Sequence, residues 1–580
     1  MLLQSSCHSP NCSYSRHGSE RVVTCSAANP MPRTAKGPPT GIWNSVTAAS
    51  SYARSAHHHP GKPRTRIIAE TFADPVMDAP EVEEEEGRRW DPKTLTAVVV
   101  GAGPTGALAA HYLAMRGYRV EVYDKGPRPS PGDAASVPLV LTSRGAIAFE
   151  ELRLEGQRRI GPTATPLRGV WDVVGRRLRP IDSTSAYRRA FVTDRSGLAS
   201  DVIRAAEERY PDSVRFHFNT ELTRAEFKNR VAGVRPSAAA DSPSAATEAA
   251  AAVTTSDEQE QEVSYDLLVG ADGLESTVRR ILKAKVKDFG VIRPVEEEAD
   301  FKAVSRLPRP AAEPLTGFFT HRPQEYVYDW SGPGKPSVRL FIDLDGAPSG
   351  VVSGLRRWDD AAAVSEELAA AYPGCFPPEW AAAIGEQVTS PSSGAPRRPA
   401  ILQCSQFYGP RCVLVGDAAH AVTGASGPVG LGQGPSAAVE SIRTLALVLR
   451  GAQDDLDKVP EVYSNVRGDA VMAMQMLEFI ELTRDPQRAA RLKFASWWYA
   501  WSAQVTQGFR WLSEAVGGLL SAILPKTFLS APQVLQRLED RRIGYSEVIK
   551  MLQGYASPVV AVVLGGIFVG LFMAFNRVLA

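Results

Sequence analysis

The sequence contains few cysteines and carries almost no net charge. Only six of its 580 residues are cysteines, and none of them forms a Cys-x-x-Cys pair. This scarcity argues against a disulfide framework and against a zinc or other metal site, and it suits a reducing compartment. The formal net charge is +1, so the composition indicates no general affinity for nucleic acid.

Acidic residues are almost missing from the N-terminal stretch. Before Glu70 the only acid is Glu20, while serine, arginine, alanine and proline are frequent. A continuous apolar core is also lacking, which excludes a secretory signal peptide. Residues 1–74 are therefore predicted to be an organelle transit peptide, with chloroplast favoured over mitochondrion because Val23–Ala27 resembles a plastid processing site; a disordered basic tail is the alternative. Residues 75–94 are predicted to be an acidic linker.

Charge is also missing close to the C-terminus. The apolar centre of this region, Pro558–Phe575, is eighteen residues long and would make ~27 Å of helix, close to the thickness of a bilayer core. Residues 556–577 are therefore predicted to be a transmembrane helix, with a buried terminal helix as the alternative. A C-terminal helical region is predicted before it, over residues 451–550.

The chain between these ends is predicted to form a large folded body. With 44% hydrophobic residues, it can bury a sizeable core in two or more structural units. Residues 237–261 are rich in alanine, serine, threonine and acids, which predicts a disordered insertion within a hairpin loop. Phe301–Asp345 alternates between apolar and polar residues in short runs, which predicts an antiparallel sheet.

The first motif is a glycine-rich turn between two strands. Thr96–Gly106 is an apolar strand that breaks into G-x-G-x-x-G, followed by a helical stretch and by a second strand that ends at Asp124. Gly101 permits a tight turn, Gly103 lets the backbone approach a pyrophosphate, and Gly106 lets the helix pack closely on the strand. The acid at the end of the second strand is placed to bind a ribose. These features together predict a dinucleotide-binding βαβ unit.

Two further apolar strands end in acids. Asp272 and Gly273 follow the strand Tyr265–Gly270, and Asp417 follows the strand Cys412–Val415. An acid at a strand end, facing the start of a helix, suits a ligand that carries both sugar hydroxyls and phosphate. The carboxylate accepts hydrogen bonds from the hydroxyls, and the free N–H groups of the helix hold the anion. By itself each of these turns is common in α/β proteins.

In this order the motifs G-x-G-x-x-G, G-A-D-G-x-x-S-x-V-R and G-D-A-A-H resemble those of the single-component FAD-dependent aromatic hydroxylases. Over residues 95–575 the chain is most similar to kynurenine 3-monooxygenase and its relatives, including Leu141–Gly145, Thr193–Leu198 and Leu524–Phe528. The resemblance implies an α/β fold. Residues 95–450 are expected to form a Rossmann-like FAD-binding domain of the p-hydroxybenzoate hydroxylase type, with an interleaved antiparallel-sheet substrate domain.

The resemblance also assigns FAD contacts. The glycine-rich turn is expected around the pyrophosphate, Asp124 at the adenosine ribose, and Asp417 at the ribityl chain. Arg144 and Arg195 match the flavin-side arginines of the family, and the helix that opens at Gly434 is expected near the isoalloxazine ring. The full set of expected FAD-binding residues is Gly101, Gly103, Thr105, Gly106, Asp124, Lys125, Arg144, Arg195, Leu222, Asp272, Gly273, Thr277, Asp417, Gly434, Pro435 and Ser436.

The implied reaction is the hydroxylation or epoxidation of a small aromatic or isoprenoid-like, lipid-like substrate by O₂, with NADPH or NADH as co-substrate. The cofactor carries this chemistry, and the protein supplies position and a dry site. No catalytic side chain is therefore assigned, and His420 is interpreted as part of the turn of the third motif. The alternatives are an FAD-dependent isoprenoid reductase and a non-catalytic, membrane-anchored protein with an FAD fold.

The chain departs from the kynurenine hydroxylases at two places. The family has a carboxylate-binding arginine two residues beyond Pro-x-Arg; here Pro166 and Arg168 are kept, but that position is Val170. The turn Gly432–Ser436 has proline and serine where the family has methionine and asparagine. Losing the arginine would leave a substrate carboxylate unpaired, at a cost of about 2–5 kcal/mol. A substrate more apolar than kynurenine is therefore expected, with Arg168 and Phe479 as candidate substrate-contacting residues.

Overall fold

The computed structural model describes residues 13–14, 23–24, 90–133, 136–156, 159–160, 164–180, 189–237, 260–297, 299–308, 323–342, 346–423, 433–483, 492–497 and 537–552, with residues 489, 499–501, 504, 511 and 534. The predicted membrane helix (556–577) lies outside the described residues, as do nearly all of the transit peptide (1–74) and of the insertion (237–261). The chain forms two compact units, Met1–Ser55 and Ala56–Ala580. In the first unit β1 (Ser13–Tyr14) pairs antiparallel with β2 (Val23–Thr24).

The second unit contains a six-stranded sheet that carries all three sequence motifs. Its strand order is β12 (Val214–His217), β4 (Arg119–Tyr123), β3 (Thr96–Val100), β16 (Leu267–Gly270), β24 (Cys412–Leu414) and β23 (Tyr408–Gly409). All neighbouring strands run parallel, except that β23 is antiparallel to β24. Strands β3 and β16 are nearly continuous apolar runs because both faces of the sheet are covered.

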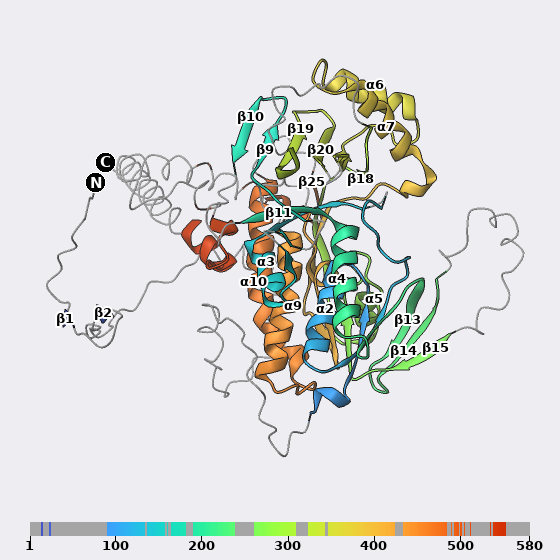
Figure 1. Ribbon diagram of the computed structural model, residues 1–580, viewed down its shortest axis with the longest axis vertical. Helices are drawn as coiled ribbons and strands as arrows, with labels where there is room; N and C mark the ends of the chain where they lie inside the picture. The colour runs from blue at the N-terminus through green and yellow to red at the C-terminus, as the bar shows by residue number, and fades with distance from the viewer. Residues whose placement is uncertain are drawn as a thin grey trace, which may run out of the picture. The chain divides into compact units, whose positions relative to one another are not determined.

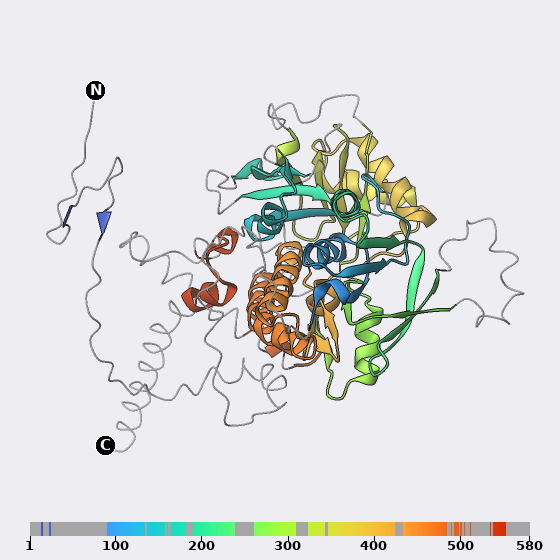
Figure 2. The same ribbon diagram turned by 60° about the horizontal axis from the view of Figure 1, so that its bottom comes forward.

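Five helices accompany this sheet: α2 (Pro104–Met115), α4 (Arg195–Arg209), α5 (Thr277–Lys285), α9 (Gly434–Gly451) and α10 (Val459–Leu482). Helix α2 is buried continuously from Gly106 to Ala114, because α4 and α9 both pack on it. Both views show α9 and α10 side by side next to α2 (Figures 1 and 2). The predicted βαβ unit is therefore confirmed as β3, α2 and β4.

A second six-stranded sheet lies in the region that is predicted to be the substrate domain. Its strand order is β10 (Arg177–Pro180), β9 (Gly169–Asp172), β19 (Tyr326–Trp330), β20 (Ser337–Ile342), β21 (Pro348–Ser353) and β18 (Phe301–Val304). Only β9 and β19 run parallel, so the antiparallel pattern predicted for this region is confirmed. Helices α6 (Ala361–Ala371) and α7 (Pro378–Thr389) pack on it through an apolar cluster that includes Trp330 and Trp380.

The remaining elements connect or extend the two sheets. They are η2 (Pro92–Thr94), β5 (Pro138–Thr142), α3 (Ser143–Glu151), β6 (Glu155–Gly156), β7 (Arg159–Ile160), β8 (Thr165–Pro166), β11 (Ala190–Asp194), β13 (Thr220–Glu226), β14 (Val231–Pro236), β15 (Gln261–Ser264), β17 (Val291–Glu297), η5 (Pro323–Glu325), η6 (Pro391–Ser393), β22 (Ala400–Cys404), α8 (Asp417–His420), β25 (Leu492–Phe494) and η8 (Arg537–Glu539). Residues 545–552 are also helical. The antiparallel pairing of β14 with β15 confirms the hairpin predicted around residues 237–261.

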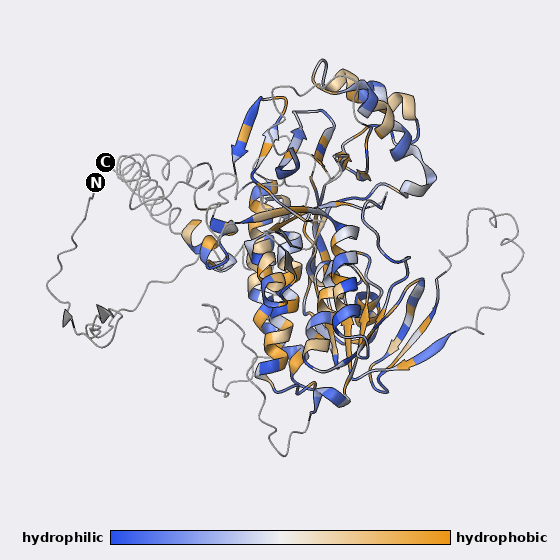
Figure 3. Ribbon diagram, in the orientation of Figure 1, coloured by the Kyte–Doolittle hydropathy of each residue, from blue (hydrophilic) through white to orange (hydrophobic). Residues whose placement is uncertain are grey.

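Hydropathy follows burial in this unit. Apolar residues gather on the central strands and on the helices packed against them, whereas the outer strand β15 is hydrophilic (Figure 3). The largest apolar cluster joins β3, β4, β16 and β24 to α2, α4 and α9. Among the helices that the structure describes, none combines the length and the apolar character needed to cross a membrane.

A buried ion pair holds the far ends of α2 and α9 together. The carboxylate of Asp454 is completely buried and accepts two hydrogen bonds of 2.5 Å from the guanidinium of Arg116. It also accepts a bond of 2.9 Å from the hydroxyl of Tyr118. Arg116 follows α2 and Tyr118 precedes β4, so the carboxylate fixes the end of the βαβ helix against the end of α9.

The Asp454→Ala substitution is expected to lower the free energy of unfolding by about 3–5 kcal/mol, because it leaves the partly buried guanidinium of Arg116 without its anion and the buried hydroxyl of Tyr118 without its acceptor. Urea denaturation followed by circular dichroism measures this change. Lys458→Ala is the control; it removes an exposed ion pair with Asp455 and should change the free energy of unfolding by less than about 1 kcal/mol. Equal effects of the two substitutions would contradict a structural role of the buried pair.

Candidate functional site

The three motifs meet at the carboxyl edge of the parallel sheet. Strand β16 lies between β3 and β24 and pairs in parallel with both, so the turns that follow these strands are neighbours. A Cβ atom on Gly101 would lie 2.5 Å from the carbonyl oxygen of Ala271, which shows that the first turn touches the second. Ligands of open parallel sheets bind at this edge.

The glycine-rich turn is shaped by close backbone contacts. Gly101 has a φ of +100°, and a Cβ atom on Gly106 would lie only 1.9 Å from the Gly101 carbonyl oxygen. Helix α2 begins directly after Gly103, and no side chain caps its N-terminus. An uncapped helix start next to a bare backbone turn is a site for an anion such as a pyrophosphate. Thr105 stands in this first helical turn, as predicted.

Asp124 closes the turn from the end of β4. Its carboxylate accepts a hydrogen bond of 2.6 Å from the N–H of Ala102 and one of 2.7 Å from the N–H of Gly126. These bonds fix the carboxylate and leave acceptor positions for ribose hydroxyls, since an ionised carboxylate offers about four lone-pair sites. Lys125 is exposed beside it. The ribose contact itself stays a prediction.

Arg195 links the glycine-rich turn to the third motif. It is the first residue of α4, and the side chain of Asp194 caps that helix by accepting from the N–H of Gly197 at 2.7 Å. One terminal guanidinium nitrogen of Arg195 lies 3.3 Å from the place that a Cβ atom on Gly103 would occupy. The same guanidinium acts electrostatically on Asp417. A cationic donor between the two turns suits a ligand with phosphate groups.

Asp417 begins the short helix α8 after β24. Its side chain is accessible to solvent, although protein atoms surround it closely. Desolvation by these protein atoms raises the pKa of Asp417 above its usual value, and the positive charges of Arg195 and Arg279 oppose that rise. Gly416, with a φ of +58°, sets the turn against Thr105, because its Cβ atom would lie 3.1 Å from the Thr105 methyl group. An acid in such a position can accept hydroxyl donors from a polyol chain.

The second motif positions the third. Asp272 accepts hydrogen bonds from the hydroxyl of Ser276 (2.5 Å), which is the N-cap residue of α5, and from the N–H groups of Thr277 (2.6 Å) and Val278 (3.2 Å) in its first turn. Burial raises the pKa of Asp272, whereas these bonds act to lower it. Arg279 donates to the carbonyl oxygen of Ala418 at 2.9 Å. The motif therefore holds the backbone next to Asp417.

Gly273 and Thr277 lie in this turn, but their predicted cofactor contacts stay predictions. Gly273 has a φ of +75°, and no atom lies within 4 Å of the place that a Cβ atom would occupy. The N–H of Thr277 is bonded to Asp272, and its hydroxyl accepts from Arg280 at 2.8 Å. The space beside Gly273 is therefore open, while the polar groups of Thr277 already have partners.

The first turn of α9 replaces the family's Met-Asn with Pro435 and Ser436. Ser436 is completely buried, and its hydroxyl oxygen accepts hydrogen bonds of 3.0 Å from both the N–H and the hydroxyl of Thr142. A Cβ atom on Gly434 would lie 3.0 Å from a methyl group of Val422. No side chain caps this helix. The altered turn thus forms an ordered helix start, tied by Ser436 to the end of β5.

His420 is buried in the same region and bonds to Ser441. Its Nε2 atom lies 2.7 Å from the Ser441 hydroxyl. Burial, aided by the positive charge of Arg467, lowers the pKa of His420 to about 3, so the ring is neutral at physiological pH. These contacts agree with a structural role for this histidine in the turn.

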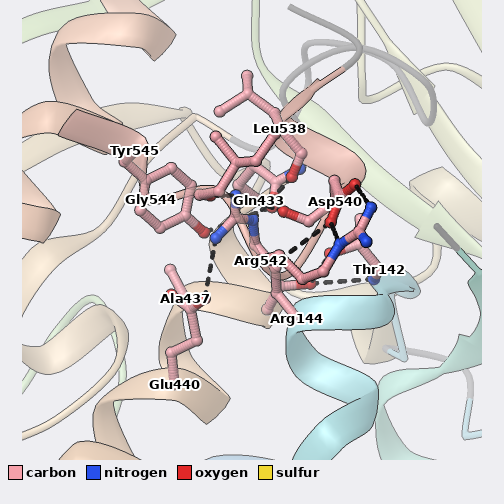
Figure 4. Close-up of polar contacts among 12 residues, drawn as sticks. Thr142, Arg144, Gln433, Ala437, Glu440, Leu538, Asp540, Arg542, Gly544 and Tyr545 are labelled. Carbon is pink, nitrogen blue, oxygen red and sulfur yellow. Dashed lines mark hydrogen bonds and ion pairs between the residues drawn. The ribbon is translucent and has the colours of Figure 1, made fainter. Parts of the chain in front are cut away.

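Arg144 has partners other than the predicted cofactor (Figure 4). It is buried in α3, and its Nε donates to the carbonyl oxygen of Leu538 at 2.7 Å. Its Nη2 donates to the carbonyl oxygens of Asp540, at 3.1 Å, and of Ile543. Three N–H groups of Arg144 therefore bond to carbonyl oxygens in the C-terminal segment, residues 537–552. The flavin contact of Arg144 stays a prediction, and no sequence pattern indicated this contact with the C-terminal segment.

The candidate substrate residues lie in different packing groups. Arg168 forms an ion pair with Glu325, and Phe479 packs in an apolar cluster with Val295 and Phe494. The ring centroids of Phe479 and Phe494 are 6.3 Å apart. Leu222, a predicted FAD contact, is buried in the main core on β13. The structure therefore places the glycine-rich turn, Asp124, Arg195 and Asp417 at one edge of the sheet. The predicted substrate residues Arg168 and Phe479 lie in separate packing groups.

Comparison with known proteins identifies relatives along most of this body. The family described as "FAD binding domain" matches residues 94–335. A kynurenine 3-monooxygenase of Aspergillus candidus is 30% identical over 399 residues, which cover 65% of this chain and 73% of that protein. One from Neurospora crassa is 25% identical over 511 residues, or 83% of this chain and 93% of that protein.

Solved structures give weaker similarity. The HpxO protein of Klebsiella pneumoniae, complexed with FAD and uric acid, has a TM-score of 0.47 and 19% sequence identity, covering 77% of this chain and 96% of that chain. A 2-methyl-3-hydroxypyridine-5-carboxylic acid oxygenase has a TM-score of 0.47 and 17% identity, covering 66% of this chain and 90% of that chain.

The Arg195→Met substitution is expected to raise the Kd for FAD by about 10- to 100-fold, because it removes the cationic donor beside the glycine-rich turn, at a residue that the family resemblance assigns to the flavin side of the cofactor. Titration of the apoprotein, followed by the loss of flavin fluorescence, measures the Kd. Arg204→Met is the matched control, since Arg204 lies on the same helix and forms an exposed pair with Asp201. An unchanged Kd for Arg195→Met would remove Arg195 from the cofactor site.

Proposed function

Because the chain belongs to the family of FAD-dependent aromatic hydroxylases that includes the kynurenine 3-monooxygenases, it is an FAD-dependent monooxygenase, and we propose that its substrate is an electron-rich aromatic molecule without the amino-acid carboxylate of kynurenine. When bound, FAD supplies the redox chemistry that activates O₂, with NADPH or NADH as the reductant. The residues of this chain supply binding, orientation and the exclusion of water.

The residues at the sheet edge fit the cofactor. The uncapped start of α2 and the bare turn at Gly103 suit the pyrophosphate, and Arg195 stands beside that turn as a cationic donor. Asp124 and Asp417 are acids at the ends of β4 and β24, where they suit the two polyol parts of the molecule. We assign the ribose to Asp124 and the ribityl chain to Asp417.

The surroundings of Val170 carry the substrate proposal. The side chain of Val170 is completely buried, in a cluster that includes Leu167, Val192 and Phe341. Among the described residues, Val170 therefore offers an apolar side chain packed on apolar neighbours at the position where the related hydroxylases are expected to have an arginine. A carboxylate buried without a partner costs several kcal/mol. The side chain of the substrate is therefore proposed to carry no carboxylate.

Arg168 does not replace the missing arginine in this proposal. Its guanidinium already pairs with the carboxylate of Glu325, which is only 13% exposed. A substrate carboxylate would have to share this guanidinium with Glu325, and two carboxylates beside one guanidinium leave an excess negative charge, which is unfavourable in a partly buried position. The pair therefore supports the same conclusion as the cluster around Val170.

Two compounds that differ only in the carboxylate test the substrate proposal. Kynuramine, the decarboxylated form of kynurenine, is expected to give a kcat/KM at least about tenfold higher than kynurenine does, because it avoids burial of an unpaired carboxylate. The assay measures NADPH oxidation together with product that has gained one oxygen atom, in air and under anaerobic conditions.

The control enzyme is the Aspergillus candidus relative, assayed with the same two compounds. The Gly106→Ala variant controls for oxidation of NADPH by other proteins, because its new Cβ atom would overlap the carbonyl oxygen of Gly101. Efficient 3-hydroxylation of kynurenine by this chain would overturn the substrate proposal. A reduced product formed without O₂ would favour the isoprenoid reductase instead.

We also propose that residues 556–577 anchor the enzyme in an organelle membrane, and that residues 1–74 direct it to the chloroplast, with the mitochondrion as the second choice. The support is compositional: an uncharged apolar stretch long enough to cross a bilayer, and an N-terminal region poor in acids. A membrane position would give the active site access to apolar substrates dissolved in the lipid.

The double substitution Val563→Arg and Ile567→Arg is expected to move the protein from the carbonate-washed membrane pellet to the soluble fraction. Each arginine near the centre of a spanning helix costs about 2.5–3.5 kcal/mol. Val563→Leu with Ile567→Leu is the matched control. A fluorescent protein fused after residue 74 should enter chloroplasts, and its retention in the cytosol would contradict the transit peptide.

A further inference from the structure

The C-terminal segment packs against the helix that begins at the flavin-side turn. This segment, defined as residues 537–552, places Leu538, Tyr545 and Val548 in one apolar cluster with Ala437 of α9 and Met474 of α10. Val422, which follows the third motif, packs against the same cluster. The segment therefore touches the elements that enclose the predicted isoalloxazine end of the cofactor site.

Arg144 is the polar centre of this contact. It donates to the three carbonyl oxygens described above, all within the C-terminal segment. Its guanidinium carbon also lies 4.5 Å from the centre of the Tyr545 ring, which allows a cation–π contact. Because the three carbonyls belong to η8 and to the turn that follows it, the guanidinium fixes that turn against η8.

Glu440 connects Arg144 to α9. Its carboxylate lies 3.5 Å from Arg144 and 3.2 Å from Arg467, so one acid balances two buried guanidinium groups. Arg467 in turn donates to the Ser441 hydroxyl at 2.9 Å and to the Ala437 carbonyl oxygen at 2.8 Å. The first two turns of α9 are thus fixed from α3, from α10 and from the C-terminal segment.

Tyr545 reaches the turn itself (Figure 4). Its hydroxyl donates to the side-chain oxygen of Gln433 at 3.4 Å, and both residues are only 2% exposed. Gln433 immediately precedes the predicted flavin contacts Gly434, Pro435 and Ser436 and forms the N-cap position of α9. The hydroxyl also shares a hydrogen bond with the carboxylate of Glu440. Burial and this carboxylate raise the pKa of Tyr545, so its hydroxyl keeps the proton that it donates.

We propose that Tyr545 is a positioning residue for the flavin-side turn Gln433–Ser436, and that docking of the C-terminal segment by Arg144 is energetically coupled to the binding of FAD. Thr142 holds this turn from one side through Ser436, and Tyr545 holds it from the other through Gln433. A turn held in its binding geometry before the cofactor arrives loses less conformational freedom when the cofactor binds. Coupling between two binding events is reciprocal, so FAD stabilises the docked segment to the same extent.

The proposal rests on FAD as the cofactor and on the predicted place of its isoalloxazine ring beside α9, but not on the identity of the substrate. Tyr545→Phe in the full-length protein keeps the ring over Arg144 and removes only the hydroxyl. It is expected to raise the Kd for FAD by about 3- to 10-fold, the effect of one lost buried hydrogen bond. It should also shift the visible absorption bands of the bound flavin, because the turn beside the ring moves.

Tyr372→Phe is the matched control for the loss of a buried hydroxyl. Tyr372 is also almost completely buried, and its hydroxyl bonds to the carbonyl oxygen of Pro336 in the substrate domain. This substitution should leave both the Kd and the flavin spectrum unchanged. If the two variants weaken FAD binding equally, Tyr545 has only a general structural role and the proposal is wrong.

A double-mutant cycle with Gln433→Met tests the contact directly. If the bond between Tyr545 and Gln433 transmits the effect, the Kd of the double variant for FAD should be close to that of the single variant with the higher Kd. The two fold-changes in Kd should then not multiply. Multiplicative effects would show that the two side chains act independently, which would overturn the proposed contact.

Limited trypsin digestion tests the reciprocal effect. Cleavage after Arg542, whose side chain is 58% exposed, is expected to be several-fold slower with saturating FAD in the unsubstituted protein, and this protection should fall in Tyr545→Phe. Cleavage that is independent of FAD in both proteins would contradict the coupling. A protein that binds no FAD at all would contradict the cofactor assignment instead, so the two failures are distinguishable.

Discussion

The predicted cofactor site depends on the close backbone contact between the turns that follow β3 and β16. Gly101 and Ala271 approach so closely that a side chain at Gly101 would collide with the carbonyl of Ala271. The adjacent strand β24 brings the third turn to the same edge, and Arg279 fixes that turn by bonding to Ala418. If this edge were more widely spaced, Arg195 could not stand beside Gly103 and also act on Asp417. The acids, the arginine and the helix start form one site because the strands are neighbours.

Much of this edge could be predicted from the sequence, because parallel strands that are buried on both faces are apolar runs ending in turns. The strand-turn-helix around Gly101–Gly106 was predictable for that reason, and so was the acid at the end of the second strand. The antiparallel sheet between Phe301 and Asp345 was predictable from its alternating pattern. In each of these regions the local pattern and the tertiary environment favour the same structure.

The contacts of Arg144 could not be predicted in the same way. Its partners in the C-terminal segment are backbone carbonyl oxygens, which every residue possesses and which therefore leave no trace in the sequence. The family resemblance predicts that Arg144 lies beside the flavin. In the structure its N–H groups bond to the C-terminal segment. Val170 is an intermediate case. The sequence shows that the expected arginine is missing, but only the packing around Val170 shows that an apolar cluster fills its place.

The separation in sequence between Arg144 and its partners has a consequence for the order in which the molecule is assembled. Arg144 and Leu538 are 394 residues apart, and domains generally fold as units, N-terminal first, while the chain is still being synthesised. The parallel sheet can form before the last segment leaves the ribosome, but the turn at Gln433 gains its contact with Tyr545 only afterwards. The predicted flavin-side end of the site is therefore completed last. A chain that ends prematurely would keep the nucleotide-binding edge while lacking one support of the turn beside the reactive ring.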